Sequence, residues 1–147
     1  MVKIDNFTSG EEYLTYGVPQ GSVLGPTLFL IYIKDLSLMP FENSKIITYA
    51  NDTVILVHGE SWPETRIRAE SGLKTVMVWL LANLLTLNTD KTTYITFAAI
   101  RASQPDCSFQ LKISKCGELS GNNCDCLRIT RVHSIKYLGI QILELSG

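Results

Sequence analysis

The sequence lacks a net positive charge and a long apolar run. Its 13 basic and 14 acidic residues give a formal net charge of −1, so the chain as a whole is not expected to attract phosphate over long distances. Any contact with nucleic acid would be local. Lys34 and Asp35 end the apolar stretch 28–33, and Asn83 interrupts the stretch 76–87. Neither stretch reaches the roughly 18 residues of a membrane span, and a soluble chain without a membrane partner is expected.

A secretory signal is absent and cysteines are few. The first residues include Lys3 and Asp5 and lack the apolar segment and cleavage site of such a signal. An intracellular location, in the cytoplasm or nucleus, is therefore expected. The cysteines all lie in the last third of the chain, at Cys107, Cys116, Cys124 and Cys126. Zinc ligands usually come in pairs about two to four residues apart, and only the last two cysteines are close together, so reduced thiols are preferred to a zinc site.

Hydrophobic periodicity predicts two helices and several strands. Proline at a helix start costs no hydrogen bond, so Pro26 is expected to open a buried helix over 26–36. Apolar residues at steps of three and four predict a second helix over 64–85. Its apolar stripe comprises Ile67, Leu73, Val76, Met77, Leu80 and Leu84. Strands are predicted over 12–18, 45–50, 53–57, 92–97, 109–113, 127–132 and 137–143.

The order of these elements indicates an α+β fold, with helices on one face of an antiparallel sheet and a small β-rich appendix at the C-terminal end. The runs 45–50 and 53–57 are expected to form a tight hairpin that turns at Asn51 and Asp52. Trp62 and Trp79 lie at the start of the second helix and within it, which favours packing over base stacking. His58 and His133 have no partner at catalytic spacing and are assigned no role.

Three further motifs accompany the hairpin tip, which on its own would be an ordinary turn. The tip reads Tyr49-Ala50-Asn51-Asp52, and upstream the block 17–26 reads Gly-Val-Pro-Gln-Gly-Ser-Val-Leu-Gly-Pro. Downstream stand Leu87-Asn88 with Lys91, and then Tyr137-Leu138-Gly139. In order and spacing these motifs resemble the reverse transcriptases of non-LTR, LINE-type retrotransposons, especially the Jockey-like kind. The resemblance extends from Tyr13 to Leu143.

The resemblance implies that the chain is the C-terminal palm fragment of an RNA-directed DNA polymerase, with an RNA template and a DNA primer as partners. Residues 1–97 would form a partial palm of the ferredoxin-like, split β-α-β type. Residues 98–147 would form a β-rich segment that carries the primer grip and leads toward the thumb. A fingers segment and an upstream palm strand, which this sequence does not contain, would complete the enzyme.

By the same resemblance, the tip corresponds to the family's Tyr-Ala-Asp-Asp. Its carboxylates, with a third from the upstream strand, would hold two Mg²⁺ ions. Here Asn51 stands at the first aspartate position and Asp52 remains as the metal ligand. A neutral amide in place of an anion shared by two cations is expected to lose several kcal/mol of stabilisation, and a loss of that order can cost decades of rate. We therefore expect the chain to be inactive alone.

The other motif residues take their expected roles from the resemblance as well. Gln20 and Gly21, with Tyr49 and Ala50, would lie against the incoming nucleotide and template. Lys91 would offset charge on the leaving pyrophosphate, and Tyr137, Leu138 and Gly139 would grip the primer backbone. A solvated lysine and a β-corner with a core tyrosine are the alternatives for these last two sites. A degenerate or co-opted remnant that binds RNA or protein without catalysis is the alternative function.

Overall fold

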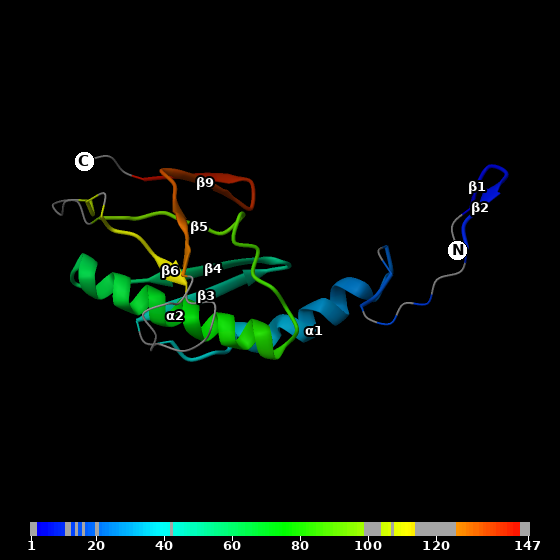
Figure 1. Ribbon diagram of the computed structural model, residues 1–147, viewed down its shortest axis with the longest axis horizontal. Helices are drawn as coiled ribbons and strands as arrows, with labels where there is room; N and C mark the ends of the chain where they lie inside the picture. Colours follow the sequence, from blue (N-terminus) through cyan, green and yellow to red (C-terminus); the bar gives the residue numbers. More distant parts are fainter. Residues whose placement is uncertain are drawn as a thin grey trace.

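The polypeptide folds into two helices and ten short strands within the part that the structure describes. This computed structural model describes residues 3–10, 13, 15, 17–19, 21–41, 43–98, 104–106, 108–113 and 126–144. In Figure 1 a hairpin of β1 (Lys3–Ile4) and β2 (Phe7–Thr8) lies apart from the body that contains both helices. These two strands were not predicted, because two residues are too few to establish a period of two. No helix in the described ranges is long and apolar enough to cross a membrane.

Helix α1 (Gly25–Ser37) confirms the first predicted helix and extends it by one residue at each end. Pro26 occupies the first turn, where its missing N–H leaves no bond unmade. The prediction that this helix is buried was wrong. Only Ile33 and Leu36 are buried, whereas the side chain of Leu30 is 53% exposed. Periodicity predicted the helix itself, but burial depends on what covers each face, and α1 meets the core along one stripe only.

Helix α2 (Trp62–Ala82) begins two residues before the predicted start and ends three before the predicted end. Ser61 caps it, because the side chain of Ser61 accepts a hydrogen bond from the Glu64 N–H at 3.4 Å, and Glu64 carries negative charge into the first turn. Of the predicted apolar stripe, Ile67 is 65% exposed and Leu84 is 89% exposed. Those two assignments were wrong, since Ile67 faces away from the core and Leu84 lies beyond the helix end.

The end of α2 is closed by a Schellman motif with leucine at the position that usually holds glycine. Leu84 has φ +54°, its N–H donates to the Leu81 carbonyl at 3.1 Å, and the Leu85 N–H donates to the Leu80 carbonyl at 2.8 Å. A side chain in the left-handed region costs about 1 kcal/mol. We therefore expect Leu84→Gly to raise the free energy of unfolding by about 1 kcal/mol, measured by urea denaturation. The control Leu81→Gly, inside the same helix, should lower it by about 1 kcal/mol, and a loss of stability in Leu84→Gly would contradict the assignment.

The predicted hairpin is present as β3 (Ser44–Tyr49) and β4 (Asp52–Val57), paired antiparallel along their whole length. The single antiparallel sheet expected from the sequence was wrong for the described residues, which form five separate two-stranded pairs. One of these, β5 (Thr93–Tyr94) with β8 (Thr130–Arg131), is parallel. The coarser expectation of a mixed α and β chain with small antiparallel sheets is confirmed.

The C-terminal strands are shorter than predicted. The run 109–113 contributes only β6 (Lys112–Ile113), 92–97 contributes only β5, and 127–132 splits into β7 (Leu127–Arg128) and β8 at the buried Ile129. The run 137–143 is not one strand, because a turn separates β9 (Ser134–Tyr137) from β10 (Ile140–Leu143). In the predicted strand 12–18, the described residues 13, 15, 17 and 18 are not in a strand.

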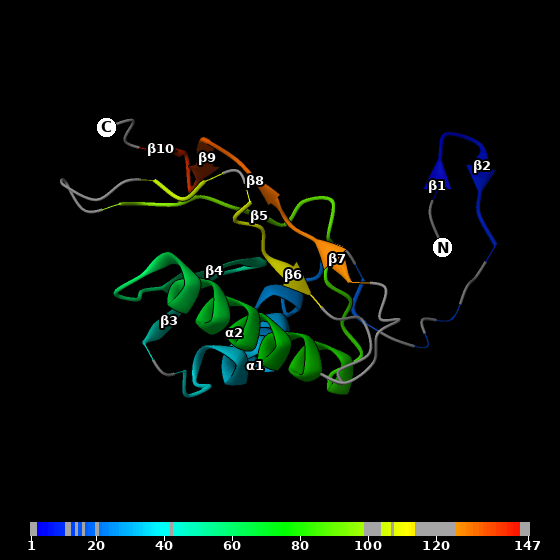
Figure 2. The ribbon, with the colours of Figure 1, turned by 60° about the vertical axis from the view of Figure 1, so that its left-hand side comes forward.

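The described residues of the body form two hydrophobic clusters. The first joins α1, β3 and α2 through Ile33, Leu36, Ile46, Val76 and Leu80, and Trp79 packs against it. The second joins α2 to the C-terminal strands through Ala69, Phe109, Leu111, Ile113 and Ile129. Trp62 packs on this second cluster with its ring 5.6 Å from that of Phe109, so the packing role predicted for both tryptophans is confirmed. Figure 2 shows β6 and β7 lying across α2. The predicted boundary between a palm segment, residues 1–97, and a β-rich segment, residues 98–147, stays a prediction.

Candidate polymerase site

The tip of the β3–β4 hairpin is a two-residue turn formed by Ala50 and Asn51. Tyr49 pairs with Asp52 across the ladder, so Asp52 is the first residue of β4. The turn predicted at Asn51 and Asp52 was therefore wrong by one residue. Ala50 has φ +50° and takes the left-handed conformation that closes the turn. Tyr49, Asn51 and Asp52 are exposed. In Figure 1 the tip points toward the end of the molecule at which α1 begins, so the four tip residues are presented to solvent at one end of the body.

The acidic groups of the described residues do not by themselves form a metal centre. Among the residues that the structure describes, no three His, Cys, Asp or Glu side chains gather closely enough to hold a metal ion. At the tip, Asp52 is one carboxylate beside the neutral amide of Asn51. Two divalent cations need several anionic oxygen ligands, so this donor set does not fit such a pair. The assignment of Asp52 as a metal ligand stays a prediction.

The glycine-rich block before α1 forms a tight turn. The Ser22 N–H donates to the Pro19 carbonyl at 3.0 Å, and Gly21 has φ +85°, a conformation that side chains disfavour. A Cβ at Gly21 would meet nothing within 4 Å, so the need for glycine there comes from the backbone angle rather than from crowding. Gln20 lies outside the described residues, and its predicted contact with nucleotide and template stays untested.

A turn formed by Asn88 accounts for the spacing between Leu87-Asn88 and Lys91. Asn88 Oδ1 accepts a hydrogen bond from the Lys91 N–H at 3.2 Å. The Asn88 carbonyl accepts from the Thr92 N–H at 3.1 Å and from Thr92 Oγ1 at 2.7 Å. Asparagine commonly bonds the backbone ahead of it in this way. The turn fixes the backbone of Lys91 at the entrance to β5 and leaves its side chain exposed; its role toward pyrophosphate stays a prediction.

The predicted primer-grip motif forms the β9–β10 hairpin. Tyr137 pairs with Ile140 across a two-residue turn, and Leu138 and Gly139 have φ +48° and +83°. Positive φ at both positions is the geometry of a type I′ turn, whose twist matches that of the strands. The Tyr137 hydroxyl is buried and makes no hydrogen bond within the described part of the chain. Primer contact by this turn stays a prediction, as does its alternative, a core tyrosine at a β-corner.

A buried carboxylate beside this hairpin was missed by sequence reasoning. The Glu144 side chain is 7% exposed and accepts hydrogen bonds from Thr96 Oγ1 and from Arg131 Nη2, the latter at 2.6 Å. His133 Nδ1 contacts its other oxygen. Burial raises the pKa of Glu144, but these hydrogen bonds outweigh burial and lower the pKa to about 2. The partners are too far apart in sequence for any local pattern to reveal them.

Acid is therefore expected to weaken the attachment of the β9–β10 hairpin. The pKa of Glu144 is about 2 in the folded protein and 4.5 for an unperturbed glutamate, so its ionised form stabilises the fold above pH 4.5. That contribution is lost as the pH falls from 4.5 toward 2. In urea unfolding, the free energy of unfolding of the wild type should fall across this pH range. The free energy of unfolding of Glu144→Gln should fall less across the same range. The control Glu60→Gln, at an exposed glutamate, should lose as much stability between pH 4.5 and 2 as the wild type. The assignment would be refuted if Glu144→Gln lost as much stability over this range as the wild type.

Comparison with known proteins agrees with these motifs. Residues 1–142 match the family described as reverse transcriptase (RNA-dependent DNA polymerase). The chain is 30% identical over 148 residues to the RNA-directed DNA polymerase from mobile element jockey of Drosophila melanogaster, across 96% of this chain and 14% of that protein. The jockey polymerase of Drosophila funebris is 30% identical over 155 residues, across 99% of this chain and 15% of that protein. No solved structure matches the chain.

The family match over residues 1–142 identifies the class of protein as an RNA-dependent DNA polymerase. The chain belongs to the reverse transcriptase family, and its relatives are the polymerases of non-LTR retrotransposons. A further relative, a probable RNA-directed DNA polymerase from transposon BS of Drosophila melanogaster, is 31% identical over 98 residues, across 63% of this chain and 11% of that protein. The chain spans 14 to 15% of the length of the jockey polymerases.

Proposed function

We propose that this chain supplies part of the palm of a retrotransposon RNA-directed DNA polymerase, which transfers nucleotides to a primer 3′-hydroxyl on an RNA template. The observation that carries the proposal is the β3–β4 tip, where Asp52 begins a strand directly after the Ala50–Asn51 turn and is exposed at one end of the body. The family match over residues 1–142 supports it. A split β-α-β palm over 1–97 and a primer-grip segment over 98–147 belong to the same proposal.

The tip is chemically impaired by Asn51. Reverse transcriptases use divalent metal ions, and Mg²⁺ is the ion proposed for this site, with Asp52 as its ligand. An amide oxygen can coordinate such an ion but carries no charge, so it leaves the repulsion between two cations less compensated than a carboxylate would. Template and primer would meet the chain at the Gly21 turn and at the Tyr137–Gly139 turn, and Lys91 would offset charge on pyrophosphate.

A repaired fusion tests this function. The segment upstream of the aligned Tyr13 position in the D. melanogaster jockey polymerase is joined to residues 13–147 carrying Asn51→Asp. We expect this protein to extend a DNA primer on an RNA template with Mg²⁺, because it restores the shared anion. The same fusion with Asp52→Asn should be silent, as should the unfused wild-type chain. A folded fusion that carries Asn51→Asp and still incorporates nothing would overturn the proposal and favour a non-catalytic remnant.

A further inference from the structure

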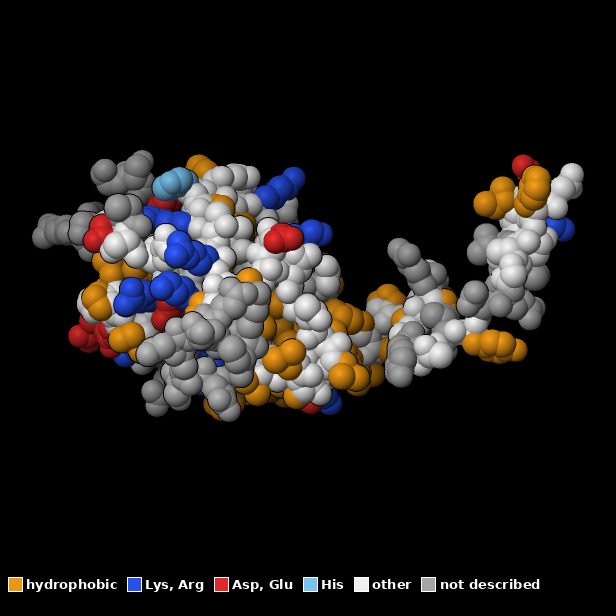
Figure 3. Space-filling model, in the orientation of Figure 1, with side chains coloured by type: hydrophobic (Ala, Val, Ile, Leu, Met, Phe, Trp, Pro, Cys, Tyr) orange, Lys and Arg blue, Asp and Glu red, His pale blue; other side chains and the backbone are white. Residues whose placement is uncertain are grey.

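Three basic side chains gather where β6 and β7 lie across α2. They are Arg66, Lys112 and Arg128, called the basic patch below, and all three are exposed. Figure 3 shows Lys and Arg side chains grouped over this region of the body. No ion pair joins any of the three to an acidic group among the described residues. The patch therefore gathers three positive charges on a chain whose net charge is −1, with the Glu70 carboxylate as the neighbouring negative charge.

Two members of the patch lie directly opposite each other. Lys112 pairs with Arg128 across the β6–β7 ladder, and the neighbouring pair is Ile113 with Leu127. Ile113 is 1% exposed and packs in the second cluster, so Lys112 and Arg128 share the outer face of the ladder. Like charges in directly opposed positions destabilise a sheet. An anion placed over the pair would relieve this repulsion.

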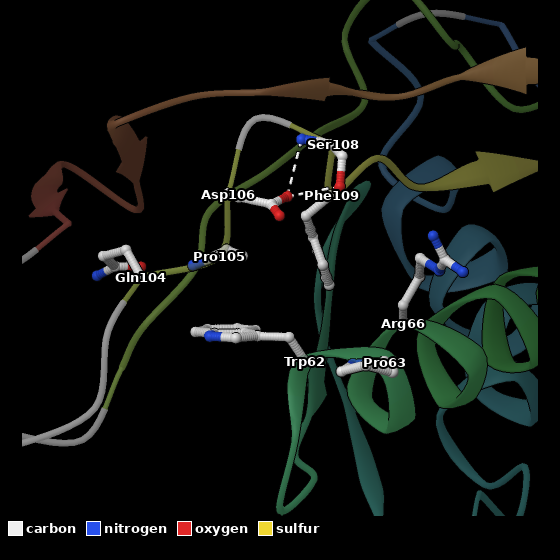
Figure 4. A pocket seen from close by; sticks show the side chains of 8 residues that line it. All are labelled: Trp62, Pro63, Arg66, Gln104, Pro105, Asp106, Ser108 and Phe109. Atoms are coloured by element: carbon white, nitrogen blue, oxygen red, sulfur yellow. Dashed lines mark hydrogen bonds between the residues drawn. The ribbon is translucent and has the colours of Figure 1, made fainter.

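Helix α2 extends the patch toward an aromatic pocket. Trp62, Arg66 and Glu70 follow at steps of four on α2 and share one face, and Glu70 Oε1 accepts a hydrogen bond from the Lys112 N–H at 3.2 Å. Trp62 and Arg66 also line an open pocket of about 390 Å³ beneath the loop that carries Asp106. Figure 4 shows the Trp62 ring on one side of this pocket and the Arg66 side chain rising from α2 on the other.

We propose that the basic patch binds the phosphate backbone of single-stranded nucleic acid, with one base entering the adjoining pocket beside Trp62. Groups of cations next to an aromatic wall are the usual means of holding single strands without sequence preference. Asp106 at the pocket rim repels phosphate and accepts donors, which favours a base in the pocket over the backbone. A duplex keeps its bases stacked and cannot fill it. This surface is distinct from the tip residues 49–52, so the inference does not depend on catalysis.

Reversing one charge in the β6–β7 ladder distinguishes a loss of RNA binding from a loss of folding, because the two measurements should change in opposite directions. Arg128→Glu places a carboxylate opposite Lys112, and Lys112→Glu places one opposite Arg128. Each should raise the melting temperature of the free protein by about 1–3 °C, because an opposed pair of opposite sign replaces one of like sign. Each should also weaken binding of a fluorescent single-stranded RNA of about 20 nucleotides roughly tenfold at about 50 mM salt. Removing a contacting cation should reduce the salt slope of log Kd by about 0.7.

Lys45→Glu provides the matched control, because Lys45 is exposed on β3 and faces Leu56 across its own ladder. It makes the same change in net charge and should leave RNA affinity near the wild-type value. Equal affinities in Arg128→Glu, Lys112→Glu and Lys45→Glu would overturn the proposal, as would no binding by the wild type. Capture by vesicles of phosphatidylserine and phosphatidylcholine without RNA binding would assign the patch to a membrane surface instead. Duplex RNA bound as tightly as the single strand would overturn the assignment of a base to the pocket.

Discussion

A fusion that keeps Asn51 is expected to extend a primer about 1000-fold more slowly than the same fusion carrying Asn51→Asp. The two side chains have nearly the same shape, and Ala50 rather than Asn51 holds the positive φ of the turn. The substitution therefore changes charge without changing the hairpin. A loss of about 4 kcal/mol of transition-state stabilisation corresponds to this factor, and removal of an anion beside two divalent cations in a partly dry cleft is of that order.

Single-turnover primer extension with saturating Mg²⁺ measures this difference. Asn43→Asp is the matched control, since Asn43 is exposed and directly precedes β3, at the end of the hairpin opposite the tip. It adds the same negative charge and should leave the rate unchanged. Equal rates for the fusions with and without Asn51→Asp would refute the claim that the tip is impaired, while leaving the family assignment intact.

Leu36→Ala should lower the free energy of unfolding by about 3 kcal/mol, whereas Leu30→Ala should change it by less than about 0.5 kcal/mol. Both leucines belong to α1 and both substitutions remove the same atoms. Leu36 is 2% exposed in the first hydrophobic cluster, and Leu30 is 53% exposed. The cost at Leu36 combines lost transfer free energy with the cavity left behind. Urea unfolding followed by circular dichroism distinguishes the two, and equal losses would show that α1 is not packed as described.

The elements that depend on local chemistry were predictable from the sequence. The step of three and four residues located α2, proline located the start of α1, and two β-rich runs around a short turn located the β3–β4 hairpin. The exact start of α2 depended on the Ser61 cap, which the apolar pattern does not contain. Burial of α1 could not be predicted, because a helix pattern does not reveal which of its faces will be covered.

The candidate site likewise has features that could be predicted from the sequence and features that could not. The tip and the turn at Asn88 follow from residues that are neighbours in sequence, so their backbone geometry was within reach of sequence reasoning. The Glu144 carboxylate draws its partners from Thr96, Arg131 and His133. Those contacts exist only after distant segments pack together. The opposed cations Lys112 and Arg128 likewise become neighbours only through the β6–β7 register.

In the hairpin tip, one residue provides the backbone conformation and another provides the chemistry, and this separation has an evolutionary consequence. Ala50 bears the conformational demand of the turn, and the exposed side chain at position 51 bears none. Selection for a folded, soluble protein therefore cannot distinguish aspartate from asparagine there. Only selection on polymerisation can maintain the acid, and once that selection lapses the codon drifts without penalty. The asparagine and aspartate codons differ at a single base, so a lineage that lost the carboxylate by mutation could regain it in one step.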